Sequence, residues 1–211
     1  MAKQERAVRT RQTLIRAAAE VFAADGYALA SLSVISQRAG VSAGALHFHF
    51  AGKDDLAREV ESAAADSVQQ MAEGNRRTAG SPLQSLVRTV FGLLVAAAED
   101  PVVRAGFKLS GDPSRKSDAE MLRWWRAFVH ELVLQAQEAG ELAQDVSADD
   151  ATTAIVAATV GFEVISMVDA EWPSVDRVAR FWSLVLPWLA AYPDRVLAAV
   201  THGARQHEGV H

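Results

Sequence analysis

Residues 32–50, LSVISQRAGVSAGALHFHF, are the stretch of this chain that decides its fold. Apolar residues recur at helical spacing on both sides of Gly40, which predicts a short helix over about 33–39 and a second over about 43–48. Ser42 precedes the second helix and can cap it, because its hydroxyl can accept a hydrogen bond from a free N–H of the first turn. Two short helices joined by a tight turn that contains Gly form a helix-turn-helix motif.

The second helix of this motif begins with the small residues Ala43, Gly44 and Ala45, which would let it approach a groove closely. Leu46 and Phe50 would anchor its other face. In helix-turn-helix proteins the N-terminal end of the second helix contacts base edges in the major groove, and the first helix crosses the backbone. The sequence therefore predicts double-stranded DNA as a partner.

Helical periodicity extends from the motif to both ends of the chain. One helix is expected before the motif, over about 6–25 and stopped by Gly26, and another begins near Lys53. Further helices are expected at about 82–99, 101–110, 117–139, 148–170 and 174–192, with a last short one from Pro193. We therefore predict an all-α chain. A three-helix helix-turn-helix DNA-binding domain would span 1–52, and a helical ligand-binding and dimerisation domain would span 53–211.

Charge is distributed unevenly along the chain. Residues 1–53 contain seven Lys and Arg against three Asp and Glu, a net charge of +4. Because the whole chain carries −5, the remaining residues carry −9. We call residues 1–53 the basic head. A basic N-terminal segment followed by an acidic remainder is expected of a DNA-binding domain joined to a domain with another function.

Composition narrows the class of protein further. The chain has no cysteine, which excludes disulfides and thiolate metal sites and fits an intracellular, cytoplasmic location. Its first residues do not read as a signal peptide. The longest apolar stretch, 151–168, contains Glu163 and several hydroxyl residues, so a buried helix explains it better than a membrane span.

The run from Gly44 to Ala57 resembles the tetracycline-repressor (TetR) family, and within it the γ-butyrolactone autoregulator receptors of actinomycetes. That branch typically reads Gly-Ala-Leu-Tyr-Phe-His-Phe, then two small residues, then Lys-Glu-Asp-Leu-Ala. Gly92, the run 101–109 and Trp125-Arg126 are also similar to this branch. The resemblance covers most of the chain and is most specific in the helix-turn-helix segment.

The resemblance implies which residues contact DNA. It implies base contacts from Ala43 and Gly44 with His47 beside them, and phosphate contacts from Ser33, Gln37, Ser42, His49 and Lys53. The branch usually has lysine where Ala43 stands and tyrosine where His47 stands, so the operator bases that this chain reads are open. For Arg6, Arg9 and Arg11, contact with DNA and simple solvation are equally open.

Two later helices carry stripes that suit a dimer interface. Ala154, Ala158, Gly161 and Ile165 form one stripe, and its small residues permit close helix packing. The next helix is rich in apolar residues, namely Val178, Phe181, Trp182, Val185 and Leu189. Together they would suit a four-helix homodimer interface, as in TetR relatives. Ordinary packing within one chain is the alternative.

A second stripe on the first of these helices, Ile155, Thr159, Phe162 and Ser166, mixes apolar surface with two hydroxyls, as a small-molecule site requires. Met121, Trp125 and Phe128 form an aromatic stripe that by itself is more typical of a core. The resemblance implies that Trp125 lines a ligand pocket. Phe91, Val95 and Leu109 are weaker candidates.

These observations predict a ligand-responsive transcriptional repressor, released from a pseudo-palindromic operator by a γ-butyrolactone-like molecule. A repressor of the same fold that senses an antibiotic or drug-like ligand is the alternative. An enzyme is disfavoured because we find no nucleophile–base pair, phosphate loop or metal spacing. His47 and His49, two residues apart on a helix, point to different faces and make a poor metal pair. We expect no cofactor and no metal.

Overall fold

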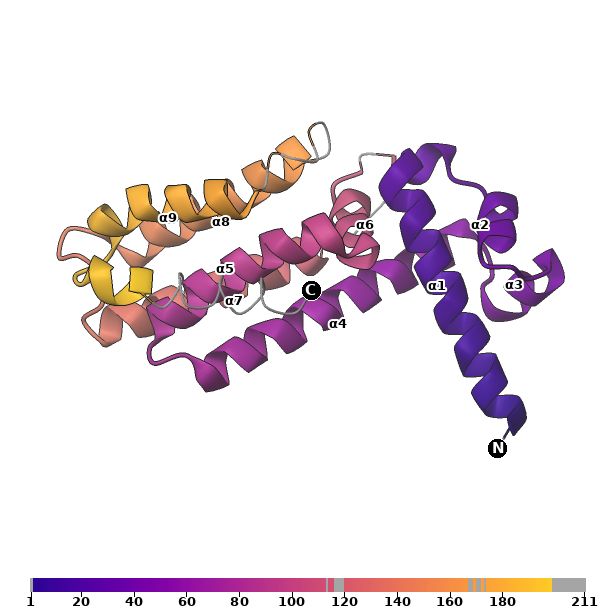
Figure 1. Ribbon diagram of the computed structural model, residues 1–211, viewed down its shortest axis with the longest axis horizontal. Coiled ribbons are helices and arrows are strands. Elements are labelled where there is room, and N and C mark those ends of the chain that lie inside the picture. The colour runs from indigo at the N-terminus through magenta and orange to yellow at the C-terminus, as the bar shows by residue number, and fades with distance from the viewer. Residues whose placement is uncertain are drawn as a thin grey trace. The chain divides into compact units, whose positions relative to one another are not determined.

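The computed structural model describes residues 2–112, 114–115, 120–166, 169, 172 and 174–198. The regular elements within these ranges are helices, and one isolated β-bridge joins Leu142 and Ala190. The helices are α1 (Ala2–Leu29), α2 (Leu32–Arg38), α3 (Ala43–His49), α4 (Lys53–Thr78), α5 (Pro82–Glu99), α6 (Pro101–Ser110), α7 (Glu120–Glu138), α8 (Ala148–Ser166) and α9 (Val175–Leu189) (Figure 1). A short helical segment follows at 193–198. The all-α prediction is confirmed.

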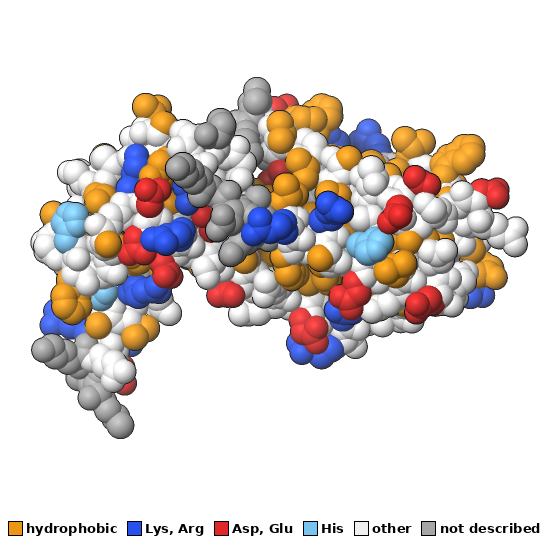
Figure 2. Space-filling model, turned by 180° about the vertical axis from the view of Figure 1, so that it is seen from behind, with side chains coloured by type: hydrophobic (Ala, Val, Ile, Leu, Met, Phe, Trp, Pro, Cys, Tyr) orange, Lys and Arg blue, Asp and Glu red, His pale blue; other side chains and the backbone are white. Residues whose placement is uncertain are grey.

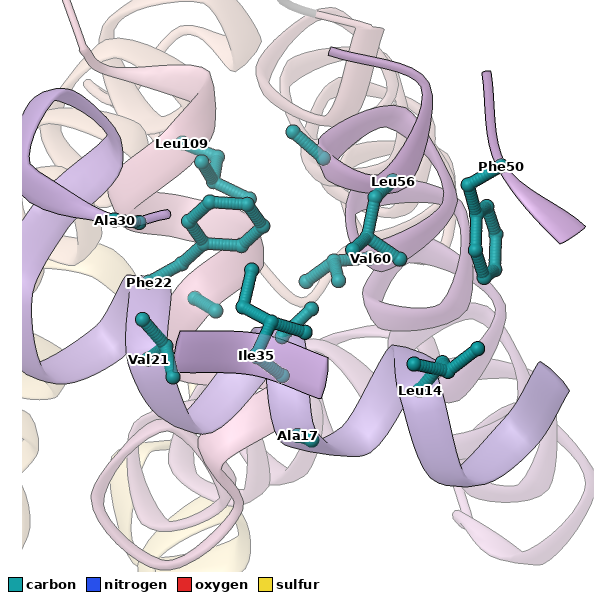
Figure 3. Close-up of a cluster of buried hydrophobic side chains, with 14 of the residues drawn as sticks. Leu14, Ala17, Val21, Phe22, Ala30, Ile35, Phe50, Leu56, Val60 and Leu109 are labelled. Carbon is teal, nitrogen blue, oxygen red and sulfur yellow. The ribbon is translucent and has the colours of Figure 1, made fainter. Parts of the chain in front are cut away.

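The helices form two compact units. Unit 1 consists of Met1–Ser67 with Glu99–Met121, and unit 2 consists of Val68–Ala98 with Leu122–His211. We expected the first domain to end at residue 52. The structure instead gives unit 1 the first half of α4 and the whole of α6, because Leu56 and Val60 of α4 and Leu109 of α6 lie in the same hydrophobic core as α1 (Figure 3).

The core of unit 1 is built on the predicted stripe of α1. Leu14, Ala18, Val21 and Phe22 are all buried, at the spacing that one face of an amphipathic helix requires. The other helices contribute Ile35, Leu46, Phe50, Leu56, Val60, Ala105 and Leu109. This core fixes α2 and α3 against α1, which positions the helix-turn-helix motif.

α6 packs closely on α4 within unit 1. A Cβ added at Gly106 would lie 2.3 Å from Cβ of Ala64, so only glycine fits at this crossing. Lys108 of the same helix donates a hydrogen bond from Nζ to the carbonyl of Ala23 at 2.9 Å. α6 is therefore held to both α1 and α4.

Local signals set the ends of the helices. Gly26 adopts φ 75°, which a residue with a side chain rarely adopts, and it interrupts the helical conformation of α1 where the sequence predicted a stop. Ser42 caps α3 as predicted, because its Oγ accepts a hydrogen bond from the N–H of Ala45 at 3.2 Å. Ser31, Asp100 and Ser174 cap α2, α6 and α9 in the same way.

Unit 2 is a helical bundle with an apolar interior. α5 buries a broad face that includes Leu83, Leu86, Leu93 and Leu94, as expected of a helix at the centre of a bundle. One carboxylate oxygen of Glu141 accepts a hydrogen bond from the N–H of Leu83 at 2.9 Å, which satisfies a free donor in the first turn of α5. None of the helices in the described part of the chain is long and apolar enough to cross a membrane.

Candidate DNA-binding surface and ligand-binding residues

The anchoring of α3 decides which of its side chains face outward. Leu46 and Phe50, four residues apart, are both buried in the core of unit 1. Ala43, Gly44 and His47, for which we predicted a position on the DNA, are all exposed. The structure therefore leaves the N-terminal end of α3 open to a groove, as direct reading of bases requires.

Most of the predicted phosphate-contacting residues are also accessible. Ser33 and Gln37 of α2 and Ser42 at the start of α3 are exposed. His49 is half-buried, and its ring meets the ring of Phe48 edge-on at a centroid distance of 5.2 Å. These residues lie on the helix-turn-helix motif of unit 1, so the structure brings them to one part of the fold.

Lys53 differs from the other predicted phosphate-contacting residues. Its Nζ donates hydrogen bonds to the carbonyls of Tyr27, Ala28 and Ala30, at 2.9, 3.4 and 3.0 Å. It also lies 4.4 Å from the centroid of the Tyr27 ring. An ammonium group has three N–H donors, and here each has an acceptor at the end of α1. In this structure Lys53 therefore joins the start of α4 to the end of α1.

Phe48 is a surface residue that the sequence interpretation did not single out. Its side chain is 81% exposed on α3, the second helix of the helix-turn-helix motif, which is unusual for a large aromatic residue. The sequence nevertheless predicts that Phe48 is exposed. Because Leu46 and Phe50 anchor the helix, a residue midway between them must point away from the core.

Most cations of the basic head have partners within unit 1. Arg11 forms an ion pair with Glu59, and its guanidinium lies 5.5 Å from the centroid of the Phe50 ring. Arg16 and Arg38 both approach the carboxylate of Glu20, at 3.8 and 3.4 Å. On the face shown in Figure 2, acidic and basic side chains are likewise interspersed with apolar ones.

Tyr27 lies at the centre of a polar cluster at the end of α1. Its hydroxyl donates a hydrogen bond to Asp54 at 2.6 Å, and the guanidinium of Arg115 lies 5.1 Å from its ring centroid. Burial, followed by the hydrogen bond to Asp54 and the charge of that carboxylate, raises the pKa of Tyr27 to about 12. Arg115 in turn forms a buried ion pair with Glu61 of α4 at 2.9 Å. The sequence interpretation missed this cluster.

An aromatic cluster on α7 contains the predicted ligand-binding residue Trp125. Its ring stacks with Phe128 at a centroid distance of 5.7 Å, and Phe128 stacks with Trp124 at 5.3 Å. The side chain of Trp125 is only 1% exposed, yet its Nε1–H has no hydrogen-bond acceptor among the described residues. Such an orphaned donor is uncommon in a protein interior and requires an explanation.

Unit 2 contains further buried polar atoms without a described partner. Oγ of Ser85 on α5 and Nε1 of Trp182 on α9 are both buried, and neither has a hydrogen-bond partner among the residues that the structure describes. The sequence interpretation named neither as a ligand candidate. Ser85 could have been found from the sequence, because it is a polar residue within the apolar helix α5.

The hydroxyl residues of α8 already donate hydrogen bonds within their own helix. Thr159 is buried and donates to the carbonyl of Ile155 at 2.7 Å, and Ser166 donates to the carbonyl of Glu163 at 2.7 Å. Each oxygen keeps its capacity to accept a hydrogen bond. Phe162 meets Phe181 of α9 edge-on, with ring centroids 5.6 Å apart. The predicted stripe of α8 thus faces both the interior and its neighbour α9.

The three weaker ligand candidates separate in the structure. Phe91 is buried and Val95 is half-buried on α5 of unit 2. Leu109 instead belongs to unit 1, where it is fully packed near Phe22 in the core (Figure 3). The physical reason is that α6 packs on α1, so we remove Leu109 from the set proposed to bind a ligand.

A surface cleft of about 400 Å³ lies between the second half of α4 and α7 in unit 2. Trp124 and Phe128 line it together with the ion pair between Arg76 and Glu131, whose atoms are 2.6 Å apart. The cleft thus combines an aromatic wall with a polar rim. Among the described residues, no group of three or more His, Cys, Asp or Glu side chains could hold a metal ion.

The outward faces of α8 and α9 expose large apolar side chains. Leu184 and Trp188 of α9 are 71% and 78% exposed, and Val164 and Ile165 of α8 are also exposed. Val178, Trp182 and Leu189, which we expected at a dimer interface, are instead buried within the chain. Of the predicted set, Phe181 and Val185 are half-buried, and the exposed apolar residues Leu184 and Trp188 of α9 were not in it.

Unit 1 exposes a helix-turn-helix motif, and unit 2 buries polar atoms that have no described hydrogen-bond partner. This combination is typical of a DNA-binding regulator. Residues 14–60 match the family described as bacterial regulatory proteins, tetR family, and residues 80–190 match the tetracyclin repressor-like C-terminal domain. The chain belongs to the TetR family of bacterial regulatory proteins. This is a family of transcription regulators, not of enzymes.

Individual relatives point to one branch of the family. The chain is 35% identical to the A-factor receptor protein of Streptomyces griseus over 197 residues, which are 90% of this chain and 67% of that relative. It resembles the crystal structure of a gamma-butyrolactone receptor described as ArpA-like, with a TM-score of 0.80, 27% identity, and coverage of 95% of this chain and 98% of the other.

A second solved structure includes DNA. It contains the TetR family protein CprB from Streptomyces coelicolor in complex with its biological operator sequence. The TM-score is 0.80 at 29% identity, and the match covers 97% of this chain and 100% of the other. These findings confirm the resemblance to the γ-butyrolactone receptors that the helix-turn-helix segment indicated.

Proposed function

We propose that this protein is a transcriptional repressor that binds a pseudo-palindromic operator as a homodimer and is released by a γ-butyrolactone-like molecule. The observation that carries the ligand half is the buried Nε1–H of Trp125, which has no acceptor among the described residues. Leaving such a donor unpaired costs about 1–3 kcal/mol, so a ligand that supplies an acceptor there gains binding energy.

A butyrolactone suits this chemistry. Its ring carbonyl is a hydrogen-bond acceptor, and its alkyl chain matches the aromatic and aliphatic surroundings of Trp125 and Phe128. The oxygens of Thr159 and Ser85 are further polar points in the interior of unit 2, which also buries Thr89, Thr152 and Glu163. The cleft between α4 and α7 adjoins the same aromatic cluster, because its wall includes Phe128, and it offers a route of access.

The DNA half rests on α3. Its exposed face carries Ala43, Gly44, His47 and Phe48, and the capped start of the helix can enter a major groove. We expect Ser33, Gln37, Ser42 and His49 to contact phosphates beside it, and the first three are exposed. A dimer would set two such helices about 34 Å apart, on successive major grooves of one face of the DNA.

The surface for dimerisation is the outward face of α8 and α9. Leu184 and Trp188 of α9 and Ile165 of α8 are exposed, and the small residues Ala154, Ala158 and Gly161 of α8 are exposed or half-buried. A monomer rarely leaves such a patch in water, and a second copy would bury it as a four-helix interface. Leu184→Glu combined with Trp188→Ala should therefore give a monomer in sedimentation analysis.

The ligand releases the dimer from its operator if it binds more tightly to a conformation in which the two α3 helices are spaced differently. α4 contributes residues to both units, so it is the element through which we expect the two sites to be coupled. A ligand with no preference between the two conformations would bind without releasing the DNA.

The test is an anisotropy titration of the full-length protein against DNA from the region upstream of its own gene, with and without ligands. We expect specific binding that butyrolactones reverse. Release by antibiotics but by no lactone would replace the ligand assignment. Absence of specific binding to any operator-like DNA at low salt would overturn the proposed function.

A further inference from the structure

The first turns of α1 lie outside the packed part of unit 1. Leu14 is the first residue of α1 in the hydrophobic core, and Gln4, Glu5, Arg6, Val8 and Arg9 are all exposed. Within unit 1, these turns project beyond α2 and α3 (Figure 1). We call residues 2–13 the N-terminal arm. None of the side chains described for the arm belongs to the core, so packing does not explain the arm.

Two cations of the arm, Arg6 and Arg9, differ from the other cations of the basic head whose side chains the structure describes. Arg11, Arg16 and Arg38 have carboxylate partners, and Lys53 donates to carbonyls at the end of α1. For Arg6 and Arg9 the structure shows no acidic partner among the residues it describes. They are three residues apart, so their guanidinium groups lie on neighbouring positions of one helix face.

Contacts made by Arg11 fix the C-terminal end of the N-terminal arm beside α3. Arg11 forms an ion pair with Glu59 of α4, and its guanidinium lies over the ring of Phe50, the residue that ends α3. The direction of the arm is therefore set relative to α3, and not by a free hinge. A helical segment that leaves this point with two unpaired arginines is continuous with the surface that faces DNA.

We propose that the N-terminal arm contacts the phosphates of the operator just outside the base pairs that α3 reads, through Arg6 and Arg9. This inference rests on the proposed DNA-binding function and extends the surface that carries it. DNA phosphate is the complementary partner because both groups are exposed, permanently cationic and able to form two hydrogen bonds to one phosphate. Such contacts add affinity without reading sequence.

The experiment compares wild type with Arg6→Gln/Arg9→Gln in the full-length protein, on its operator, over a range of salt concentrations. Each phosphate contact contributes about 0.9 to the slope of log affinity against log salt, so loss of four contacts per dimer lowers the slope by up to about 3.6. We expect affinity to fall roughly tenfold to a hundredfold at moderate salt, with the same factor on specific and nonspecific DNA.

Duplex length provides a second readout that a merely structural role would not change. Trimming base pairs from both ends of the operator should weaken wild type until it matches the arm variant, and the variant itself should be insensitive to trimming. The charge-matched control is Arg77→Gln/Arg123→Gln, which removes two exposed cations from unit 2. It should leave both the salt slope and the dependence on length unchanged.

The outcomes are distinguishable. If wild type binds the operator and the arm variant keeps its affinity, slope and length dependence, this inference is overturned while the proposed function stands. Equal losses in the arm variant and in the unit 2 control would also overturn it, because net charge alone would then explain the effect. Failure of wild type to bind DNA overturns both.

Discussion

Nζ of Lys53 donates a hydrogen bond to the carbonyl of Tyr27 at 2.9 Å and lies 4.4 Å from the centroid of that residue's ring. The first residue of α4 thus closes the end of α1, where free carbonyls need donors. The helix-turn-helix motif lies between these two residues in the sequence. This contact therefore holds together the two helices that flank the motif.

Lys53→Met should destabilise unit 1 without removing a DNA contact. It deletes charged hydrogen bonds and a cation–π contact while keeping the apolar stem, which we expect to cost about 2 kcal/mol of unfolding free energy. Thermal unfolding measures this loss. The salt slope of operator binding should stay unchanged. A fall of about 1.8 per dimer would instead assign Lys53 to phosphate.

Gly106→Ala should be destabilising although alanine is the better helix former. The propensity gain is about 1 kcal/mol, but the new Cβ would lie 2.3 Å from Cβ of Ala64, and relieving such overpacking costs about 1–3 kcal/mol or more. We expect a lower unfolding temperature. In the double variant Gly106→Ala/Ala64→Gly most of the loss should be recovered, and a purely additive result would contradict the steric explanation.

Trp125→Phe should weaken ligand binding by more than its effect on stability explains. It removes the unpaired N–H together with part of the buried indole ring, so the cavity should lower the unfolding temperature, and Trp182→Phe, which deletes the same atoms from another buried tryptophan, is the matched control. Lactone-induced release from the operator should require at least about tenfold more ligand, equivalent to one charge-neutral hydrogen bond of about 1.4 kcal/mol. If Trp182→Phe weakens release and Trp125→Phe does not, the ligand acceptor belongs beside α9.

Ala43→Lys should change operator preference and leave the fold intact. Residue 43 is exposed at the start of α3, and alanine offers only a methyl group to a thymine, whereas lysine can donate to guanine. We expect a gain of about 1–3 kcal/mol for operators with guanine at the facing position. Selection from a randomised operator library measures it. Ala24→Lys, an equal charge change on α1, should leave the preference unchanged.

Tyr27 should titrate above its usual range. Burial and the hydrogen bond to Asp54 favour the neutral phenol and raise the pKa of Tyr27 to about 12 from 10.0. The corresponding stability is fully present below pH 10.0 and is lost as the pH rises towards about 12, since the unfolded chain ionises first. Subtracting the tyrosinate absorbance of Tyr27→Phe from that of wild type isolates this titration, and a midpoint near 10 would contradict the structure.

Local sequence was sufficient for the helical elements and for the recognition surface. Gly26 and Gly40 mark ends and turns because they adopt positive φ, and Ser42 caps α3 through its own hydroxyl, so these features need no distant contact. The spacing of Leu46 and Phe50 likewise sets which face of α3 is buried, and with it the exposure of Gly44 and His47, while Ala43 is exposed in the first turn. Phe48 followed from the same spacing, although it was not singled out.

Tertiary structure decided the features that depend on distant partners. The sequence could not say that α6 packs on α1, which places Leu109 in the core of unit 1, nor that three carbonyls at the end of α1 surround the ammonium of Lys53. On α9, two apolar stripes compete for burial. Val178 and Trp182 face inward while Leu184 and Trp188 face outward.

The sequence by itself determined an all-helical regulator with a helix-turn-helix motif, because helix periodicity, caps and turns are encoded over a few neighbouring residues. Only the tertiary structure decided which described cations have a carboxylate or carbonyl partner and which buried indole N–H groups lack a described acceptor. Both depend on groups far away in the chain, which satisfy a charge or a hydrogen bond only after folding has brought them within about 3 Å.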